Sequence, residues 1–389
     1  MLLGFKTELK LNNLQRTVLL KHCGVSRHAW NWGLALTRAI LEHNSTLSEN
    51  KLKFPTAIDL HKYLVALVKP ENPWYYECSK SAPQSALRDL STAWKRCFKK
   101  TSGQPRFKKK GRNDSFTLEG TCKIKGNCTI QVPKIGKLKT YERLPQVDKI
   151  KSVTISRQAD RWFISFKIET QIQELSNTTV IGVDLGIKSL ATLSTGEVIE
   201  GAKSYRKNKT RLSRLQWLNR NKIIGSSNWK KAQIQIARLH RKISNIRKDT
   251  IHKLTSLLAK NHGTVVIEDL NVSGMIKNHK LAGAISDMGF YEIRRQLEYK
   301  CKLYGSKLVV VDRWFPSSKT CSNCGHKKES LCLSERVFEC ESCNFTIDRD
   351  LNAAINLSHC GLGVSRHLLQ PRKPRCTPQW LPKGRKWPV

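Results

Sequence analysis

Two Cys-x-x-Cys pairs, separated by 15 residues, limit how the carboxyl-terminal part of this 389-residue chain can fold. Four thiolates at this spacing are typical of a tetrahedral zinc site, and a site filled entirely by protein ligands is structural. Iron–sulfur ligation and four free thiols are the alternatives. Gly325 suits a tight turn after the first pair, whereas Cys332 is expected to be a bystander. The predicted zinc ligands are Cys321, Cys324, Cys340 and Cys343.

The charge of the chain indicates a polyanionic partner. Lysine and arginine number 70 against 30 aspartate and glutamate, which gives a net charge of +40. Because the excess runs through most of the chain, nucleic acid is the expected partner, and a membrane surface is the alternative. We find neither a run of about 18 apolar residues nor a secretion signal, so no membrane contact is expected. The nine unpaired cysteines suit a reducing compartment and are expected to be buried.

The first 170 residues combine strand and helix patterns. Residues 1–10 predict an edge strand, and residues 116–169 have the period of two that strands require, with a hairpin turning at Ala159–Asp160. These segments therefore predict one β domain, formed by residues 1–10 and 101–170. A helical domain, residues 11–100, is inserted in it.

Three helices are expected in the inserted domain. Asn12 or Asn13 can cap a helix that stops at Gly24, and a second helix follows Ser26. The third spans residues 82–100. Its predicted buried face has Leu87, Leu90, Trp94, Cys97 and Phe98, and its opposite face has Gln84, Arg88, Ser91, Lys95 and Lys99.

The second half of the chain alternates strands with helices, which predicts an α/β domain. Residues 180–201 predict two strands with a turn at Gly196, and residues 203–248 begin a basic helical pair that turns at 225–227. A buried strand at 263–270, a helix ending at Gly305 and a strand at 307–312 follow. Residues 171–178 suit a linker. The basic, proline-rich tail from 359 to 389 is expected to be poorly ordered.

Three acidic residues stand in apolar surroundings in this basic chain. Asp184 ends the run "VIGVD", Glu268 ends "TVVIE", and Asp350 lies in the first turn of the predicted helix "DRDLNAAINL". Buried carboxylates are costly unless they are paired or bind a metal, and oxygen ligands suit Mg²⁺. Two such ions can support phosphodiester hydrolysis. Each acid also has a structural explanation: a turn, a salt bridge or a helix cap, and Asp269 or Asp348 could be the ligand instead.

Several ordered motifs resemble those of the TnpB family, the transposon-encoded RNA-guided nucleases related to small type V CRISPR effectors. The motifs are "GVDLGIKSLATLSTG", "VVIEDLNVSGM", "WFPSSKTCSNCG", the second cysteine pair and "DRDLNAAINL", and the resemblance covers nearly all of residues 1–357. It implies an RNase H-like (RuvC) fold with Asp184, Glu268 and Asp350 as the catalytic triad. It also implies a guide RNA made from the transposon end, and cleavage of matching double-stranded DNA beside a short motif.

Together these patterns predict an α+β multidomain protein. The expected parts are a β-barrel-like wedge domain (1–10 and 101–170), a helical recognition domain (11–100), an RNase H-like α/β nuclease domain (177–319 and 346–358), an inserted zinc-ribbon knuckle (320–345) and the tail (359–389). We expect a prokaryotic, cytoplasmic, nucleoid-associated monomer with one RNA. Its expected cofactors are two Mg²⁺ ions and one structural Zn²⁺.

Basic surfaces are the expected nucleic-acid contacts, because a protein guided by RNA holds a heteroduplex by its backbone. Gln84 is the candidate for reading the short motif, since glutamine can bond adenine in the major groove. The other candidates are Arg88, Lys95, Arg106, Lys108, Lys109, Lys110, Arg241, Lys242 and Arg247. A solvated basic face is the simpler explanation of each. Competing functions are a miniature CRISPR effector, a strand-transfer transposase and a non-cutting RNA-guided regulator.

Overall fold

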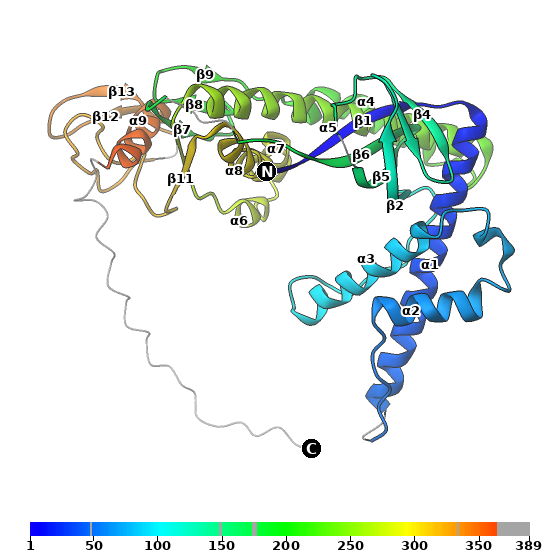
Figure 1. Ribbon diagram of the computed structural model, residues 1–389. Coiled ribbons are helices and arrows are strands. Elements are labelled where there is room, and N and C mark those ends of the chain that lie inside the picture. The colour runs from blue at the N-terminus through cyan, green and yellow to red at the C-terminus, as the bar shows by residue number, and fades with distance from the viewer. Residues whose placement is uncertain (47–48, 148–149, 173–176, 333, 364–389) are drawn as a thin grey trace, which may run out of the picture. The chain divides into compact units, whose positions relative to one another are not determined.

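The period-two segments form a closed barrel of six strands in the first half of the chain (Figure 1). The order around the barrel is β1 (Leu2–Lys10), β4 (Gly136–Thr140), β3 (Thr129–Val132), β2 (Ser115–Ile124), β5 (Ile150–Gln158) and β6 (Arg161–Glu169). Strand β1 pairs with both β4 and β6, so the prediction of an edge strand is wrong. The predicted hairpin is confirmed: Gln158 pairs with Arg161 across the turn at Ala159–Asp160.

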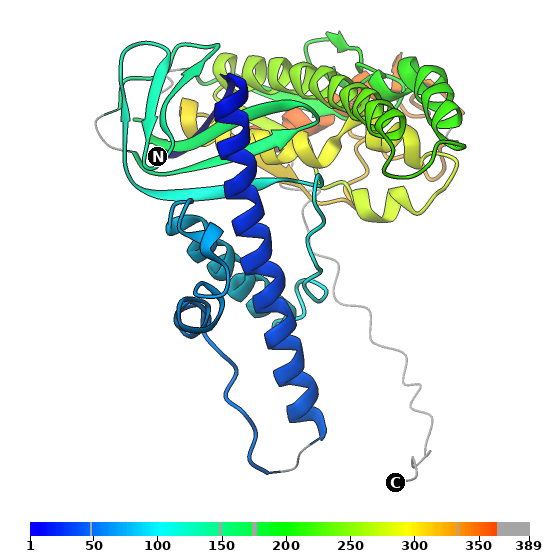
Figure 2. The same ribbon diagram turned by 90° about the vertical axis from the view of Figure 1, so that its right-hand side faces the viewer.

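The helices between β1 and β2 are α1 (Asn13–Thr46), α2 (Ala57–Tyr63) and α3 (Ser81–Phe98). Helix α1 is continuous through Gly24 (Figure 2), so the predicted stop is wrong. Cys23 packs in the barrel core and Val25 packs with α3, so burial on both sides outweighs the cost of about 1 kcal/mol for a helical glycine. On α3, Leu87, Leu90 and Trp94 are buried as predicted. Phe98 is 54% exposed, so its predicted burial is wrong.

This computed structural model describes residues 1–46, 49–147, 150–172, 177–332 and 334–363. The chain forms two compact units. The first contains Met1–Gln171 and Asn208–Ile243, and the second contains Ile172–Lys207 and the residues from Ser244 onward. No helix in the described part of the chain is long and apolar enough to cross a membrane.

A five-stranded sheet organises the second unit. Its order is β11 (Lys307–Val311), β10 (Thr264–Glu268), β7 (Val180–Asp184), β8 (Ala191–Leu193) and β9 (Val198–Ile199). The first three strands are parallel, whereas β8 and β9 run antiparallel to their neighbours. Residues 180–201 therefore form three strands rather than the predicted two. Gly196, at φ 90°, turns the chain between β8 and β9, as predicted.

Helices cover both faces of this sheet. They are α5 (Ser227–Asn261), α6 (Val272–Ile276), α7 (Ala282–Met288), α8 (Phe290–Tyr304) and α9 (Arg349–Leu362). Helix α4 (Ser204–Asn219) packs instead against α5 through Leu212, Leu239 and Ile243, which belong to the first unit. Leu258 of α5 and Leu297 of α8 pack with Val183 and Ile267 on one face. On the other face, Leu357 of α9 packs with Val266 and Val311. The predicted end of α8 at Gly305 is confirmed, with φ 76°.

Helix α9 lies directly on strand β7. A Cβ added at Gly182 would lie 1.9 Å from the carbonyl oxygen of Ala354 and 2.5 Å from the nitrogen of Ser358. A Cβ at Gly361 would meet Val180 at the start of the same strand. The carboxyl end of α9 therefore lies over the beginning of β7, and its amino end lies toward the end of β7.

Helix α9 continues to Leu362, so residues 359–362 of the predicted tail are helical. The remainder of that prediction, residues 364–389, lies outside the described residues, as does part of the predicted linker at 171–178. Four unpaired cysteines are buried, namely Cys23, Cys78, Cys122 and Cys301, whereas Cys332 is exposed. The prediction of burial is therefore wrong for Cys332 and holds only in part for Cys97, Cys128 and Cys360, which are half-buried.

Substitution of Gly182 by alanine should destabilise the second unit by about 3 kcal/mol, because the new methyl group must displace helical backbone. Gly283→Ala is the matched control. This glycine lies in α7 with no heavy atom within 4 Å of an added Cβ, so alanine should be neutral or stabilising there. Thermal unfolding and limited proteolysis measure both variants. Equal stability of the two would show that α9 does not depend on this close approach.

Candidate active site and cysteine cluster

The parallel register of β7 and β10 brings two acidic residues to the same sheet edge. Val183 pairs with Ile267, and Asp184 and Glu268 are the next residues on each strand. Successive side chains on a strand alternate between faces. Because Gly182 and Val266 face α9, Asp184 and Glu268 also lie on that face. Asp350, one turn before Ala354 at the amino end of α9, therefore lies toward both.

The three carboxylates share an unfavourable electrostatic environment. Burial raises the pKa of Asp184 to about 7, and the negative charges of Asp350 and Glu268 add to the shift, whereas Arg349 opposes it. Burial, and secondarily the charge of Asp269, also raises the pKa of Glu268. Among the described residues, the oxygen atoms of these three carboxylates do not all lie within 4.8 Å of one another. The four cysteine sulfurs described below do. Carboxylates that repel one another at a sheet edge fit the chemistry of a hard divalent cation.

Asp348 and Asp350 have different roles at the beginning of α9. The Oδ1 atom of Asp348 accepts hydrogen bonds from the backbone nitrogens of Asp350 (2.9 Å) and Leu351 (3.0 Å), so Asp348 is the N-cap of α9. Asp350 is not the cap. Its side chain is 26% exposed, and its Oδ1 lies 3.9 Å from Nε of Arg349. Asp350 is therefore not occupied by capping, and its negative charge contributes to the raised pKa of Asp184.

Glu268 and Asp269 also differ in their contacts. Asp269 accepts hydrogen bonds from Arg294 of α8 and from Arg313, which follows β11. These bonds, with Arg313 the stronger influence, lower the pKa of Asp269. Among the described residues, Glu268 has no ion pair. The salt-bridge explanation considered for Glu268 therefore applies to Asp269 instead.

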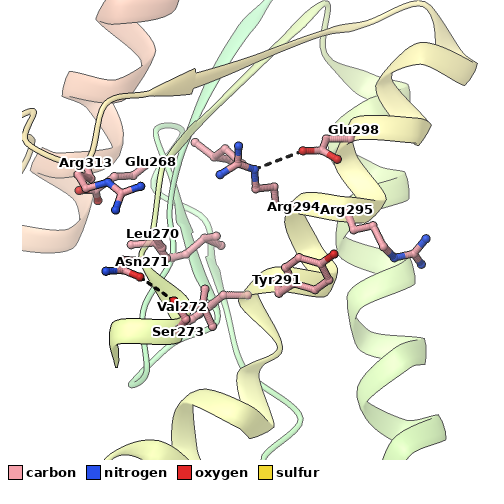
Figure 3. Close-up of a pocket in the computed structure, with 13 residues that line it drawn as sticks. Glu268, Leu270, Asn271, Val272, Ser273, Tyr291, Arg294, Arg295, Glu298 and Arg313 are labelled. Carbon is pink, nitrogen blue, oxygen red and sulfur yellow. Dashed lines mark hydrogen bonds and ion pairs between the residues drawn. The ribbon is translucent and has the colours of Figure 1, made fainter. Parts of the chain in front are cut away.

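A cavity of about 480 Å³ lies beside Glu268, at the carboxyl ends of the parallel strands (Figure 3). Asn271, Tyr291, Arg294 and Arg313 are among its lining residues. Crevices at this edge of α/β sheets commonly bind ligands. Arg294 and Arg313 were not predicted as site residues. The sequence marks them only by their positions: Arg313 follows strand β11 by two residues, and Arg294 lies on the amphipathic helix α8.

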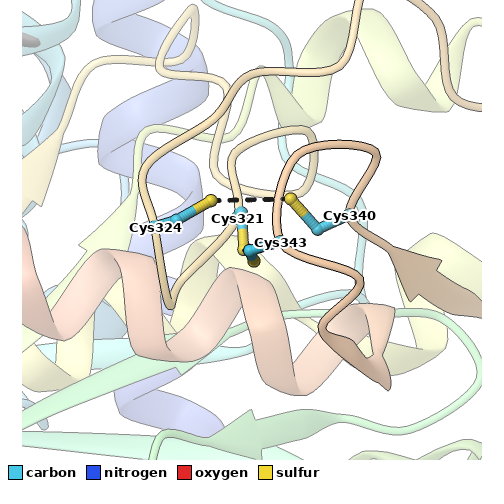
Figure 4. A group of neighbouring side chains, drawn as sticks. All are labelled: Cys321, Cys324, Cys340 and Cys343. Carbon is cyan, nitrogen blue, oxygen red and sulfur yellow. Dashed lines mark hydrogen bonds between the residues drawn. The ribbon is translucent and has the colours of Figure 1, made fainter.

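The four predicted zinc ligands form one cluster (Figure 4). All four Sγ atoms lie within 4.8 Å of one another, with 3.7 Å between Cys321 and Cys343 and 3.5 Å between Cys324 and Cys340. Sulfurs about 2.3 Å from a tetrahedral zinc ion are separated by roughly 3.8 Å, so this set could hold zinc. Cys332 is not part of the cluster, as predicted.

The two turns of the cluster have the same backbone geometry. The residue after each second cysteine has a left-handed conformation, namely Gly325 at φ 79° and Asn344 at φ 55°. The backbone nitrogen of Gly325 donates to Cys321 O, and that of Asn344 donates to Cys340 O. The prediction of a tight turn at Gly325 is confirmed. Glycine and asparagine adopt this conformation at least cost.

Buried asparagines connect the cysteine segment to α9. Asn352 is fully buried; its Oδ1 accepts from Ser322 N (2.9 Å) and its Nδ2 donates to Thr320 O (2.7 Å). Asn356 Nδ2 donates to the carbonyls of Ser317 and Thr320. Ser322 lies between the cysteines of the first pair, and Asn352 follows Asp350 by two residues. The cysteine cluster and the first turn of α9 are therefore held in register.

The candidate nucleic-acid contacts differ in availability. Arg88 is bonded to Glu119 and Ser85, and Arg241 lies 3.8 Å from Asp160. Arg247 donates to Ser286 O at 2.8 Å. The Nζ atom of Lys108 lies 4.0 Å from the ring centroid of Trp30, and burial lowers its pKa. Arg88 is exposed in spite of its bonds, and the other exposed candidates are Gln84, Lys95, Arg106, Lys109, Lys110 and Lys242.

Comparison with known proteins agrees with this arrangement. Residues 163–279 match a family model described as "Probable transposase", residues 290–357 match "Cas12f1-like, TNB domain", and residues 1–45 match "Helix-turn-helix domain". A Streptomyces pristinaespiralis protein named "Putative RNA-guided DNA endonuclease" is 43% identical over 74% of this chain and 73% of its own length. The Escherichia coli K12 protein "Putative RNA-guided DNA endonuclease InsQ" is 33% identical over 93% of this chain and 92% of its own length. The chain belongs to the TnpB family.

A solved structure supports the mixed α/β fold. The chain in "Cryo-EM structure of the Cas12f1-sgRNA-target DNA complex" matches with a TM-score of 0.54 at 18% identity, over 88% of this chain and 82% of that one. Residues 1–45, which match the helix-turn-helix description, form β1 and most of the single helix α1. The turn is absent here because α1 packs in two cores at once.

Replacement of Asp184 by asparagine should stabilise the protein at pH 8 in buffer without added magnesium. The raised pKa means that the folded state holds a proton between about pH 4 and 7 that the unfolded chain has released. This stabilisation is present at low pH and is lost as the pH rises through 7, where the charged carboxylate is unfavourable. The neutral amide avoids that cost. The expected gain is on the order of 1 kcal/mol at pH 8 and vanishes near pH 4.

Thermal unfolding at the two pH values measures the difference. Asp249→Asn is the control, because this aspartate is exposed on α5 and paired with Lys253. Its effect should be small and similar at both pH values. If the wild-type protein is more stable than Asp184→Asn at pH 8, the charged carboxylate of Asp184 is not unfavourable in the folded state.

Replacement of Cys340 by serine should remove bound zinc and loosen residues 317–347. Three remaining thiolates bind zinc weakly, and the turns then lose their common anchor. Metal content and sites of limited proteolysis are the measurements. Cys332→Ser is the matched control, since this thiol lies between the pairs but outside the cluster. If both variants retain one equivalent of zinc, the ligand set is wrong.

Proposed function

We propose that this protein is an RNA-guided DNA endonuclease that cuts double-stranded DNA complementary to its guide RNA. The observation that supports this most is the presence of three acidic residues, Asp184, Glu268 and Asp350, at one edge of the sheet in a chain of charge +40. Relatives named as RNA-guided DNA endonucleases support the same proposal. The sheet with α9 is the proposed RNase H-like (RuvC) nuclease domain, residues 177–319 and 346–358.

The three carboxylates would hold Mg²⁺, which in such sites lowers the pKa of water and stabilises the leaving oxygen of a phosphodiester. Asp184 and Glu268 project from adjacent parallel strands, so their spacing depends on the sheet. Asp350 projects from α9, and its position depends on the contact with Gly182. Asp269 bonds Arg294 and Arg313, which line the cavity together with Glu268, so among the described residues neither arginine forms an ion pair with Glu268.

The cysteine segment, residues 320–345, is proposed to bind structural zinc and to hold the beginning of α9. Its hydrogen bonds to Asn352 support this role. The first unit is proposed to bind nucleic acid: the barrel as a wedge domain, and residues 11–100 as a recognition domain. Gln84 is exposed on α3, where it could read the short motif beside the target, and Lys95 lies on the same helix. The guide RNA would come from the transposon end, with one RNA per monomer.

A second source for the guide is favoured by one observation. Residues 290–357 match a Cas12f1-like domain, which belongs to a CRISPR effector. Sequencing the RNA that copurifies with the protein distinguishes the two sources. A transposon-end scaffold supports our proposal, and a repeat from a CRISPR array favours the effector. A joined strand-transfer product formed without RNA would favour a transposase instead.

The isosteric variants Asp350→Asn and Asp348→Asn test the proposed site. Asp350→Asn should reduce DNA cleavage by at least about 100-fold, because a metal-binding oxygen becomes an amide. Asp348→Asn should retain cleavage within a few-fold, since asparagine caps a helix as well as aspartate. Cleavage of a matched duplex by the RNA complex is the measurement, and target binding should survive in both variants. Activity in Asp350→Asn with loss in Asp348→Asn would reverse the assignment.

A further inference from the structure

Trp314 is 85% exposed, the highest value among the large apolar side chains of the described residues. Single exposed apolar residues are common on protein surfaces and need no explanation by themselves. A tryptophan is a costly choice for such a place, because it leaves an extensive apolar surface in water. Its position in the chain is therefore of interest: it follows β11 by three residues.

The backbone on both sides of Trp314 is fixed. The backbone nitrogen of Trp314 donates to Asp312 Oδ1 at 2.8 Å, and that of Phe315 donates to Asp312 O at 3.0 Å. Arg313 is bonded to Asp269, and Phe315 packs against the small core beneath α9. The indole therefore projects into solvent from an anchored loop.

The anchored loop begins at the edge that has the three acids. Val311 of β11 pairs with Glu268 of β10, and the backbone nitrogen of Asp269 donates to Val311 O at 2.9 Å. Trp314 is thus three residues beyond the strand partner of Glu268, a reach of at most about 10 Å along the chain. The loop that has Trp314 therefore starts next to Glu268, at the proposed site of cleavage.

We propose that Trp314 is a stacking platform for one base of the DNA strand that enters the acidic site as a single strand. This inference rests on the proposed nuclease function. Aromatic rings bind single-stranded nucleic acid by stacking on its bases. This contact tolerates any sequence, because every base has a face on which a ring can stack. A nuclease that leaves sequence reading to a guide RNA requires that kind of contact. A fixed indole also loses little conformational entropy when it binds.

The surroundings of Trp314 favour a nucleic-acid strand over a protein partner. A protein-docking surface requires a contiguous apolar patch. Here the preceding residues, Asp312 and Arg313, are exposed and charged, and Phe315 is packed inward. The chain charge of +40 also selects polyanions.

Photo-crosslinking of the full-length protein tests the proposal. The probe is an oligothymidylate of about 15 nucleotides with a central 5-iododeoxyuridine, without guide RNA or added magnesium. Salt at about 0.3 M weakens the contacts to phosphate and leaves stacking. Peptide mapping should locate the crosslink at Trp314. Because no cleavage is required, this result is independent of nuclease activity.

Binding of the same oligonucleotide, measured by fluorescence anisotropy, should weaken about 10-fold in Trp314→Ala. Stacking of one base is worth ~1–3 kcal/mol, and tenfold corresponds to 1.4 kcal/mol. Trp314→Phe should recover most of the affinity. Tyr205→Ala, which removes another exposed aromatic ring, is the control and should bind as wild type does. In the RNA complex, Trp314→Ala should bind target normally and cut it about 10-fold more slowly.

Three results would overturn the inference. One is a crosslink elsewhere together with unchanged affinity of Trp314→Ala, even if the wild-type protein cuts DNA. Another is equal loss of affinity in Trp314→Phe and Trp314→Ala, which would indicate a packing role. The third is a change in oligomeric state of Trp314→Ala without a change in DNA affinity, which would assign the ring to protein docking. Failure of the wild type to cut any matched DNA, with the crosslink retained, would refute the nuclease function instead.

Discussion

The contact between the backbone of α9 and strand β7 at Gly182 is the constraint on which the proposed active site depends. With no side chain at Gly182, the helix approaches the sheet until its own carbonyl at Ala354 occupies the space of a Cβ. The antiparallel run of α9 over β7 then carries Asp350 toward Asp184. A carboxylate from a helix thereby joins two carboxylates from strands, although they are separated by more than 80 residues along the chain.

The cysteine cluster stabilises the same contact from the other side. The chain leaves β11, forms the cysteine turns and re-enters the unit at α9, so both ends of this insertion lie at the sheet edge proposed as the active site. Asn352 and Asn356 are buried, and their amide groups bond carbonyls and a backbone nitrogen in the insertion. Buried amides are tolerated only when bonded, so these residues fix the approach of the insertion to one arrangement. The Asn-rich helix is therefore part of the cysteine segment's framework as well as the support of Asp350.

Local patterns in the sequence were sufficient to predict much of this unit. The apolar runs ending at Asp184 and Glu268, the helix beginning near Asp350 and the turn at Gly325 all depend on neighbouring residues. Features that depend on distant residues were not predicted. Strand β1 closes the barrel through pairing with β6, and α1 passes through Gly24 because two separate cores bury Cys23 and Val25. The bonds from Asp269 to Arg294 and Arg313 join residues 25 and 44 positions apart, which no local pattern reveals.

In two pairs of acidic residues that are near neighbours in the chain, Asp348 with Asp350 and Glu268 with Asp269, one residue has a structural role and the other is a proposed metal ligand. In each pair one carboxylate is engaged in structural hydrogen bonds: Asp348 caps α9, and Asp269 bonds two arginines. The other member, Asp350 or Glu268, has no strong cationic partner in the described residues and shares its surroundings with Asp184. The chain has 70 cationic side chains, and Asp269 bonds two of them beside Glu268. Because Arg294 and Arg313 bond Asp269, an acid with a structural role leaves Glu268, the proposed metal ligand, without an ion pair among the described residues.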